Sequence, residues 1–163
     1  KKIKFEISKK QNFIEYSING IDYLKKISNI IKKYQGGVLI IDYGYLEEKM
    51  KNTLQAITNH KYSEILENIG NSDITHNINF NLFKRVIKKI GGLNQITTNQ
   101  RNFLIKMGIQ QRAEIISKNL PFSKKTSIFF RLKRLIDNKQ MGNHFKVMLI
   151  KNKNNKFNLG FSK

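Results

Sequence analysis

One stretch, from Gly36 to Tyr45, constrains the fold of this chain more than any other. It reads GGVLIIDYGY: two glycines, four aliphatic residues, then an acid, an aromatic residue and a third glycine. A continuous apolar run between turn residues is typical of a strand buried on both faces, because a sheet with one wet face would alternate apolar and polar residues. We therefore predict a buried strand over residues 38–43 in an α/β sheet.

Asp42, Tyr43 and Gly44 stand at the end of this predicted strand. Sheets of the α/β class bind ligands just beyond the carboxyl ends of their parallel strands, so functional side chains are expected here. A structural interpretation is equally open. Gly44 could supply a turn with positive φ, and Asp42 could cap the segment that follows it.

Helical and strand periodicities alternate along the rest of the chain. Helices are predicted where apolar residues recur at helical spacing beside capping residues, and strands where short apolar runs stand between turn residues. The predicted helices cover residues 17–34, 62–66, 79–90, 99–107, 110–118 and 123–136, and the predicted strands cover residues 3–7, 53–57, 93–97 and 144–150.

The composition limits the function classes. The chain has 163 residues, enough for one domain with a core, and a net charge of +20. Its 26 lysines are scattered and only 5 arginines accompany them, so we do not expect a nucleic-acid partner, although a basic nucleic-acid-binding protein is kept as an alternative. No cysteine, no signal-peptide pattern and no apolar run of ~18 residues occur, which favours a soluble intracellular protein.

No motif for a common catalytic or metal centre is present. The sequence lacks G-x-S-x-G, G-x-G-x-x-G, H-E-x-x-H and P-loop patterns. His60, His76 and His144 lie far apart without carboxylates at ligand spacing, so no metal site is expected.

A series of short motifs runs in order over residues 36–150. The motifs are GGVLIIDYGY, Thr53-Leu54-Gln55-Ala56, His60, Gly70, Asp73-Ile74-Thr75, Phe80, Gln100, Phe103-Leu104, Gly108-Ile109, Arg112, Met141-Gly142 and Phe145-Lys146-Val147. Each motif is weak alone, but their order and spacing together resemble the MidA-like S-adenosylmethionine-dependent methyltransferases. The mitochondrial member of that family is a protein-arginine methyltransferase that assists the assembly of respiratory complex I.

The resemblance implies a Rossmann-like methyltransferase fold with additional helices, of which this chain is the C-terminal half. Residues 1–150 would belong to that domain, and residues 151–163 would form a basic, disordered tail. The cofactor S-adenosylmethionine would bind mainly to a glycine-rich loop upstream of Lys1, in a missing N-terminal half. The implied partners are a protein substrate, possibly a complex I subunit, and the implied location is the bacterial cytoplasm, or the mitochondrial matrix in a eukaryote.

The chain departs from the family pattern at one segment. Family members commonly read DLTAHVDF where this sequence has DITHNINF, from Asp73 to Phe80. Asn77 stands at the position of the usual histidine, and Asn79 replaces the second acid. We therefore do not predict a catalytic role for His76 from the family pattern.

Transfer of a methyl group to an arginine nitrogen needs carboxylates that hold the guanidinium and allow a proton to leave. Asp42 and Asp73 are the catalytic candidates in this chain. Tyr43, Gly44, Gln55 and Gln100 are candidates for the substrate pocket, although the two glutamines could equally satisfy buried backbone groups. The non-enzymatic alternative is an inactive remnant that still binds an assembly partner in complex I biogenesis.

Overall fold

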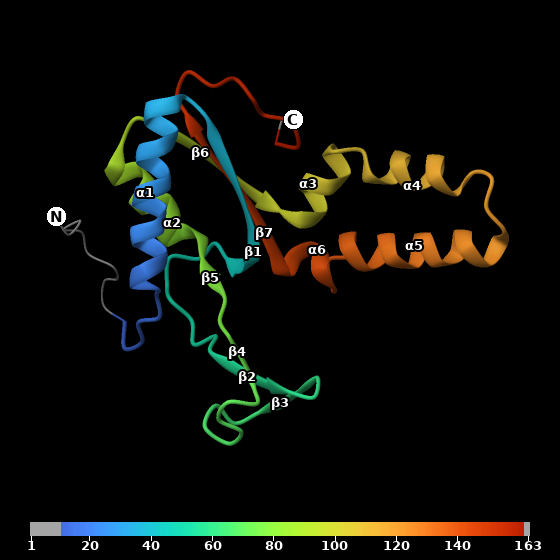
Figure 1. Ribbon diagram of the computed structural model, residues 1–163, viewed down its shortest axis with the longest axis horizontal. Coiled ribbons are helices and arrows are strands. Elements are labelled where there is room, and N and C mark those ends of the chain that lie inside the picture. Colours follow the sequence, from blue (N-terminus) through green and yellow to red (C-terminus); the bar gives the residue numbers. More distant parts are fainter. Residues whose placement is uncertain (1–10, 162–163) are drawn as a thin grey trace.

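The computed structural model describes residues 11–161, and Figure 1 shows their arrangement. The predicted strand at residues 3–7 lies outside the described residues. A four-stranded sheet with the strand order β5-β1-β7-β6 forms the centre, and a separate three-stranded sheet has the order β3-β2-β4. The strands are β1 (Gly37–Tyr45), β2 (Gln55–Thr58), β3 (Lys61–Ser63), β4 (Asp73–Thr75), β5 (Ile78–Asn79), β6 (Leu93–Asn99) and β7 (Phe145–Asn152).

Six helices accompany these strands in the described part of the chain. Two of them, α1 and α2, lie together beside the central sheet, whereas α4 and α5 form a hairpin that projects from the opposite side (Figure 1). The helices are α1 (Ile18–Tyr34), α2 (Phe80–Ile90), α3 (Gln100–Lys106), α4 (Ile109–Ser117), α5 (Phe122–Ile136) and α6 (Met141–His144). Residues 62–66, predicted as helical, instead begin in β3, so that prediction is wrong.

The central ladder joins β1 to β7, the last strand of the chain. They pair in antiparallel register from Gly37 opposite Lys151 to Tyr43 opposite Phe145. On its other edge β7 pairs in antiparallel register with β6, so β1 and β6 run in the same direction. The β7 interior is almost completely buried, because both of its edges are paired and both of its faces are covered.

The core lies between this sheet and the helix pair α1 and α2. Ser17 caps α1 by accepting a hydrogen bond of 2.9 Å from the amide N–H of Gly20, and Asn79 caps α2 in the same way. Lys32 of α1 donates a 2.9 Å bond to the Ile90 carbonyl at the end of α2, where a cation is favoured by the helix dipole. The buried cluster consists of Ile21, Leu24, Ile31, Met50, Phe80, Leu82, Val86, Ile87, Leu93, Met148 and Ile150.

The prediction that β1 is buried on both faces is wrong. Val38 and Ile40 pack against the core, but Leu39 and Ile41 on the opposite face are 44% and 47% exposed. Among the described residues only β5 pairs along the second edge of β1, and only opposite Gly44 and Tyr45. Leu39 and Ile41 point away from the core, and the described residues cover that face of β1 only in part.

Gly44 has a packing role rather than the predicted turn role. It lies inside β1 and is absent from the residues with positive φ. A Cβ atom at this position would lie 2.3 Å from the Ile78 carbonyl oxygen and 2.6 Å from a ring carbon of Phe80. Glycine therefore lets β5 and the first residue of α2 approach β1 closely.

The C-terminal segment also differs from expectation, because β7 continues to Asn152 and the chain then folds back. Lys151 is buried, and its amine donates to the Phe157 carbonyl and to Asn158 Oδ1 at 2.8 and 2.7 Å. The ring of Phe161 packs on Phe103 with centroids 5.3 Å apart. Residues 151–161 are thus held by specific contacts, whereas a disordered tail was predicted from their composition.

We expect Gly44→Ala to lower the free energy of unfolding by about 1–3 kcal/mol, because the new methyl group overpacks a backbone contact. Urea unfolding followed by circular dichroism measures this change. Gly36→Ala is the matched control, since no atom lies within 4 Å of a Cβ atom placed there. Equal effects of the two substitutions would contradict the packing role of Gly44.

Candidate functional site

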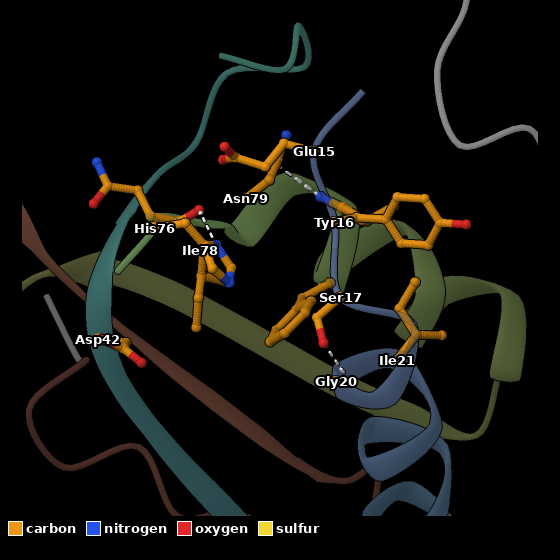
Figure 2. Close-up of a pocket in the computed structure, with 12 residues that line it drawn as sticks. Glu15, Tyr16, Ser17, Gly20, Ile21, Asp42, His76, Ile78 and Asn79 are labelled. Atoms are coloured by element: carbon orange, nitrogen blue, oxygen red, sulfur yellow. Dashed lines mark hydrogen bonds between the residues drawn. The ribbon is translucent and has the colours of Figure 1, made fainter. Parts of the chain in front are cut away.

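A cavity of about 250 Å³ lies at the carboxyl end of β1, where the sequence predicted a site. The residues before α1, the first turn of α1, the segment around β5 and the start of α2 enclose it (Figure 2). Its lining combines two carboxylates, one imidazole and two amide side chains with apolar residues. The lining residues are Glu15, Tyr16, Ser17, Gly20, Ile21, Asp42, His76, Asn77, Ile78, Asn79, Leu82 and Phe83.

The two carboxylates of this cavity have different roles. Glu15 accepts hydrogen bonds from the Thr53 amide N–H at 3.1 Å, the Thr53 hydroxyl at 2.5 Å and the Leu54 amide N–H at 3.1 Å. Asp42 is exposed, and its Oδ1 accepts a 2.8 Å bond from the neighbouring Tyr43 amide. Glu15 thus holds the loop before β2 in place, while Asp42 stays available to a ligand.

A second, larger cleft of about 680 Å³ lies beside the first cavity, and Asn77 lines both. Tyr43 forms one wall, with its ring 4.0 Å from the ring of Phe145 between centroids. Gln55 donates from Nε2 to the Thr75 hydroxyl at 3.0 Å. The lining residues are Tyr43, Gly44, Tyr45, Leu46, Glu47, Lys51, Gln55, Tyr62, Asn77, Asn143, His144 and Lys146.

Charged groups of both signs line this cleft. Lys51 bonds to Glu47 at 2.6 Å, and that hydrogen bond lowers the pKa of the Glu47 carboxyl below its usual range. Burial lowers the pKa of the Lys146 amine, which donates to the Asn143 carbonyl. Lys146 stands directly opposite Asp42 in the ladder between β1 and β7. The Lys146 amine lies in the second cleft near Glu47 and Lys51, whereas Asp42 lines the first cavity.

The structure brings together most of the predicted residues. Asp42 lines the first cavity, whereas Tyr43, Gly44 and Gln55 line the second. Asp73 was expected in a polar loop over the site, but it lies on exposed β4 of the small sheet, opposite Ile57 and outside the lining of both cavities.

Gln100 also lies away from these cavities. It is buried at the start of α3, and its Nε2 donates a 2.9 Å bond to the Leu135 carbonyl of α5. Gln100 thus hydrogen-bonds a backbone carbonyl group, which was the alternative to a substrate-pocket role in the sequence analysis.

Sequence reasoning missed Glu15 and the central position of Asn77. The amide N–H of Asn77 donates a 2.8 Å bond to the Thr53 hydroxyl, which in turn bonds to Glu15. These three residues come from segments far apart in the chain, so periodicity gives no signal for their contact. The departure from the family pattern at residue 77 was the one available indication.

Residues 11–161 do not show a glycine-rich cofactor loop. The first cavity is smaller than the ~300–1,000 Å³ of typical ligand pockets, whereas the second cleft, at about 680 Å³, falls within that range. Both double glycines, Gly36-Gly37 and Gly91-Gly92, stand at the amino ends of β1 and β6. A phosphate- or nucleoside-binding loop follows the carboxyl end of a strand instead. The cofactor loop that the resemblance implies is therefore not found among these residues.

Sequence comparison connects this site to a protein family. Residues 1–98 match a family described as "Putative S-adenosyl-L-methionine-dependent methyltransferase", which is more than half of the chain. The chain belongs to this family. The predicted resemblance is confirmed, and the matched region contains Asp42, Asp73 and both strands that carry them.

Curated relatives are protein arginine methyltransferases. The mitochondrial protein arginine methyltransferase NDUFAF7 of Xenopus tropicalis is 30% identical over 129 residues, which is 78% of this chain and 29% of the relative. Its homologue from Caenorhabditis elegans is 32% identical over 92 residues, or 55% of this chain and 21% of the relative. The chain thus spans less than a third of the length of these relatives.

Two solved structures from Burkholderia thailandensis share the fold. An uncharacterized protein superimposes with a TM-score of 0.80 at 18% identity, covering 91% of this chain and 41% of the other. A "likely methyl transferase" bound to S-adenosyl-homocysteine gives a TM-score of 0.67 at 19% identity over 88% and 36% of the two chains. The predicted α/β class and Rossmann-like methyltransferase fold are confirmed.

Two further observations concern the described residues. Within residues 11–161, no three His, Asp or Glu side chains gather as they would to hold a metal ion. Over the same range, no helix has both the length and the apolar character needed to cross a membrane.

We expect Glu15→Gln to lower the free energy of unfolding by about 1–2 kcal/mol, because an amide cannot replace a carboxylate that accepts three hydrogen bonds. Thermal and urea unfolding measure the loss, and amide hydrogen exchange at Thr53 and Leu54 should become faster. Glu114→Gln on exposed α4 is the control. Unchanged exchange at both amides would show that Glu15 does not hold this loop.

Proposed function

We propose that this chain is the C-terminal part of an S-adenosylmethionine-dependent methyltransferase that modifies a protein arginine. The membership of the family and the names of the relatives support the reaction class. This assignment rests on Asp42, an exposed carboxylate at the carboxyl end of β1 that lines the first cavity.

We further propose that a second polypeptide segment completes the enzyme, and that it pairs with the free edge of β1. Three observations support this. The chain spans 29% of the Xenopus relative, the second edge of β1 is paired within residues 11–161 only at Gly44 and Tyr45, and Leu39 and Ile41 are exposed beside the unpaired part. A parallel strand added there would pair with the free edge and place its own carboxyl end beside Asp42, and a helix connected to that strand would cover Leu39 and Ile41.

In the completed enzyme the residues of this chain would bind and orient the arginine. S-adenosylmethionine, when bound, supplies a methyl group on a sulfonium that is open to in-line attack by a nitrogen. The Asp42 carboxylate would pair with the guanidinium and align one nitrogen, since bidentate carboxylate pairing fixes the plane of that group. Tyr43 would form a wall of the pocket, and Gln55 would offer an amide to the substrate. Asp73 lies outside both cavities, and a catalytic role for it stays a prediction.

The biological setting follows from the resemblance. The relatives named above are described as mitochondrial, and the family resemblance implies methylation of a complex I subunit during assembly. We propose the same class of substrate here, in the mitochondrial matrix of a eukaryote or in the bacterial cytoplasm.

Calorimetric titration of S-adenosylmethionine tests the completion of the site. We expect no binding to this chain alone, and binding with a Kd on the order of 10 µM when the polypeptide carrying the rest of the domain is added. Micromolar binding to the chain alone would show that it already contains the cofactor site. Absence of binding in both samples would favour the inactive remnant.

Asp42→Asn in the completed enzyme tests the catalytic assignment. We expect methyl transfer to a peptide arginine to fall by about a hundredfold or more, because the carboxylate that aligns the guanidinium is lost. The melting temperature should change little, since the Asp42 side chain bonds only locally to the Tyr43 amide. Asp22→Asn, at an exposed position of α1, is the matched control. A large loss of stability with Asp42→Asn would instead make Asp42 a structural cap.

A further inference from the structure

Helix α5 carries a surface that the methyltransferase site does not use. It forms half of the helical hairpin that projects from the domain (Figure 1), and none of its fifteen residues is fully buried. Phe122 is 85% exposed, Phe130 is 71% exposed and Phe129 is 43% exposed. Such large aromatic side chains are costly to leave in water, so their clustering marks an interaction surface.

The three phenylalanines share one face of the helix. Phe129 and Phe130 follow Phe122 by seven and eight residues, so both lie about two helical turns further along the side on which Phe122 lies. The adjoining side of α5 packs through half-buried Ile128, Leu132 and Leu135, and α5 lies against α4, α3 and α6. The stripe therefore lies outside the contacts that hold the hairpin together.

The charge of α5 is entirely positive. Lys124, Lys125, Arg131, Lys133 and Arg134 lie within it, and the helix contains no acidic residue. Two of these lysines stand in the first turn, where the helix dipole favours an anion, and no acid in that turn compensates them. An anionic partner would relieve this repulsion.

We propose that the Phe122–Phe129–Phe130 stripe docks an acidic amphipathic helix of a partner protein. Lys133 follows Phe129 and Phe130 by four and three residues, so a cation lies within the stripe itself. Apolar side chains of a facing helix would cover the phenylalanines, while its flanking acids would pair with Lys125, Lys133 and Arg134, as flanking charges do in paired helices.

Other occupants fit this surface less well. A second copy of the chain would bring the same five cations face to face in a symmetric contact. Insertion into a lipid bilayer would draw the Lys133 ammonium toward hydrocarbon along with the phenylalanines. A nucleic acid would satisfy the cations but would leave the hydrophobic stripe partly in water.

Two synthetic peptides test this proposal. The first is a helical peptide of about 18 residues with leucines on one face and glutamates beside them, and the second carries lysines in place of the glutamates. We expect the acidic peptide to bind the full chain with a Kd on the order of 10–100 µM, more weakly at high salt, and to shift the backbone NMR signals of α5. The basic peptide should not bind.

Surface variants then locate the contact. Phe130→Ser and Lys133→Glu should each weaken binding of the acidic peptide about tenfold. Ile18→Ser and Lys26→Glu on α1 are matched controls, because Ile18 is also exposed, at 65%, and lies on a different helix. Unchanged melting temperatures would show that all four variants fold.

Several results would overturn the proposal. These are failure of the acidic peptide to bind, equal binding of both peptides, or binding that survives Phe130→Ser. Binding of anionic phosphatidylglycerol vesicles or of oligouridylate with the same dependence on Phe130 and Lys133 would assign the surface to lipid or RNA. Loss of peptide binding when the completing polypeptide is added would show that this polypeptide, and not a partner protein, covers the α5 stripe. That result does not depend on whether the complex transfers methyl groups.

Discussion

The antiparallel pairing of β1 with β7 is the interaction on which the rest of the structure depends. It joins seven residue pairs from distant parts of the chain, and β7 in turn carries β6 on its other edge. The ladder fixes where β1 ends, and therefore where Asp42 lies relative to Lys146 and Phe145. The helices α1 and α2 can bury their apolar faces only because this sheet offers them a continuous surface.

One face of β1 is covered by the core, whereas its other face is covered only in part and most of its second edge lacks partners in residues 11–161. One face of β1 contributes Val38 and Ile40 to the core, whereas Leu39 and Ile41 remain exposed next to an edge with few partners in the described part of the chain. Unpaired edges and exposed aliphatic residues are normally avoided in sheets. Together with the small share of the relatives that the chain spans, this asymmetry is the physical basis for proposing a completing polypeptide.

Around the end of β1, a set of half-buried polar contacts connects the segments that line the site. Glu15, Thr53 and Asn77 form a chain of hydrogen bonds that connects the segment before α1 with the loops on both sides of the small sheet. Because Glu15 is used for this purpose, Asp42 is left as the accessible carboxylate of the first cavity. Structural and chemical roles are thus divided between two acids in one cavity.

The elements whose signal is local can be predicted from the sequence: a strand at residues 38–43, which lies within β1, helices at residues 17–34, 79–90 and 99–107, and the family to which the motifs belong. What those elements face depends on how the whole chain folds. In the fold, one side of β1 is exposed and Asp73 lies on the small sheet. Gln100 donates a hydrogen bond to the α5 backbone, and hydrogen bonds from Lys151 hold the segment that follows β7. The reason is physical: caps and apolar runs act within a few residues, whereas burial and hydrogen-bond partners depend on segments that meet only when the chain folds.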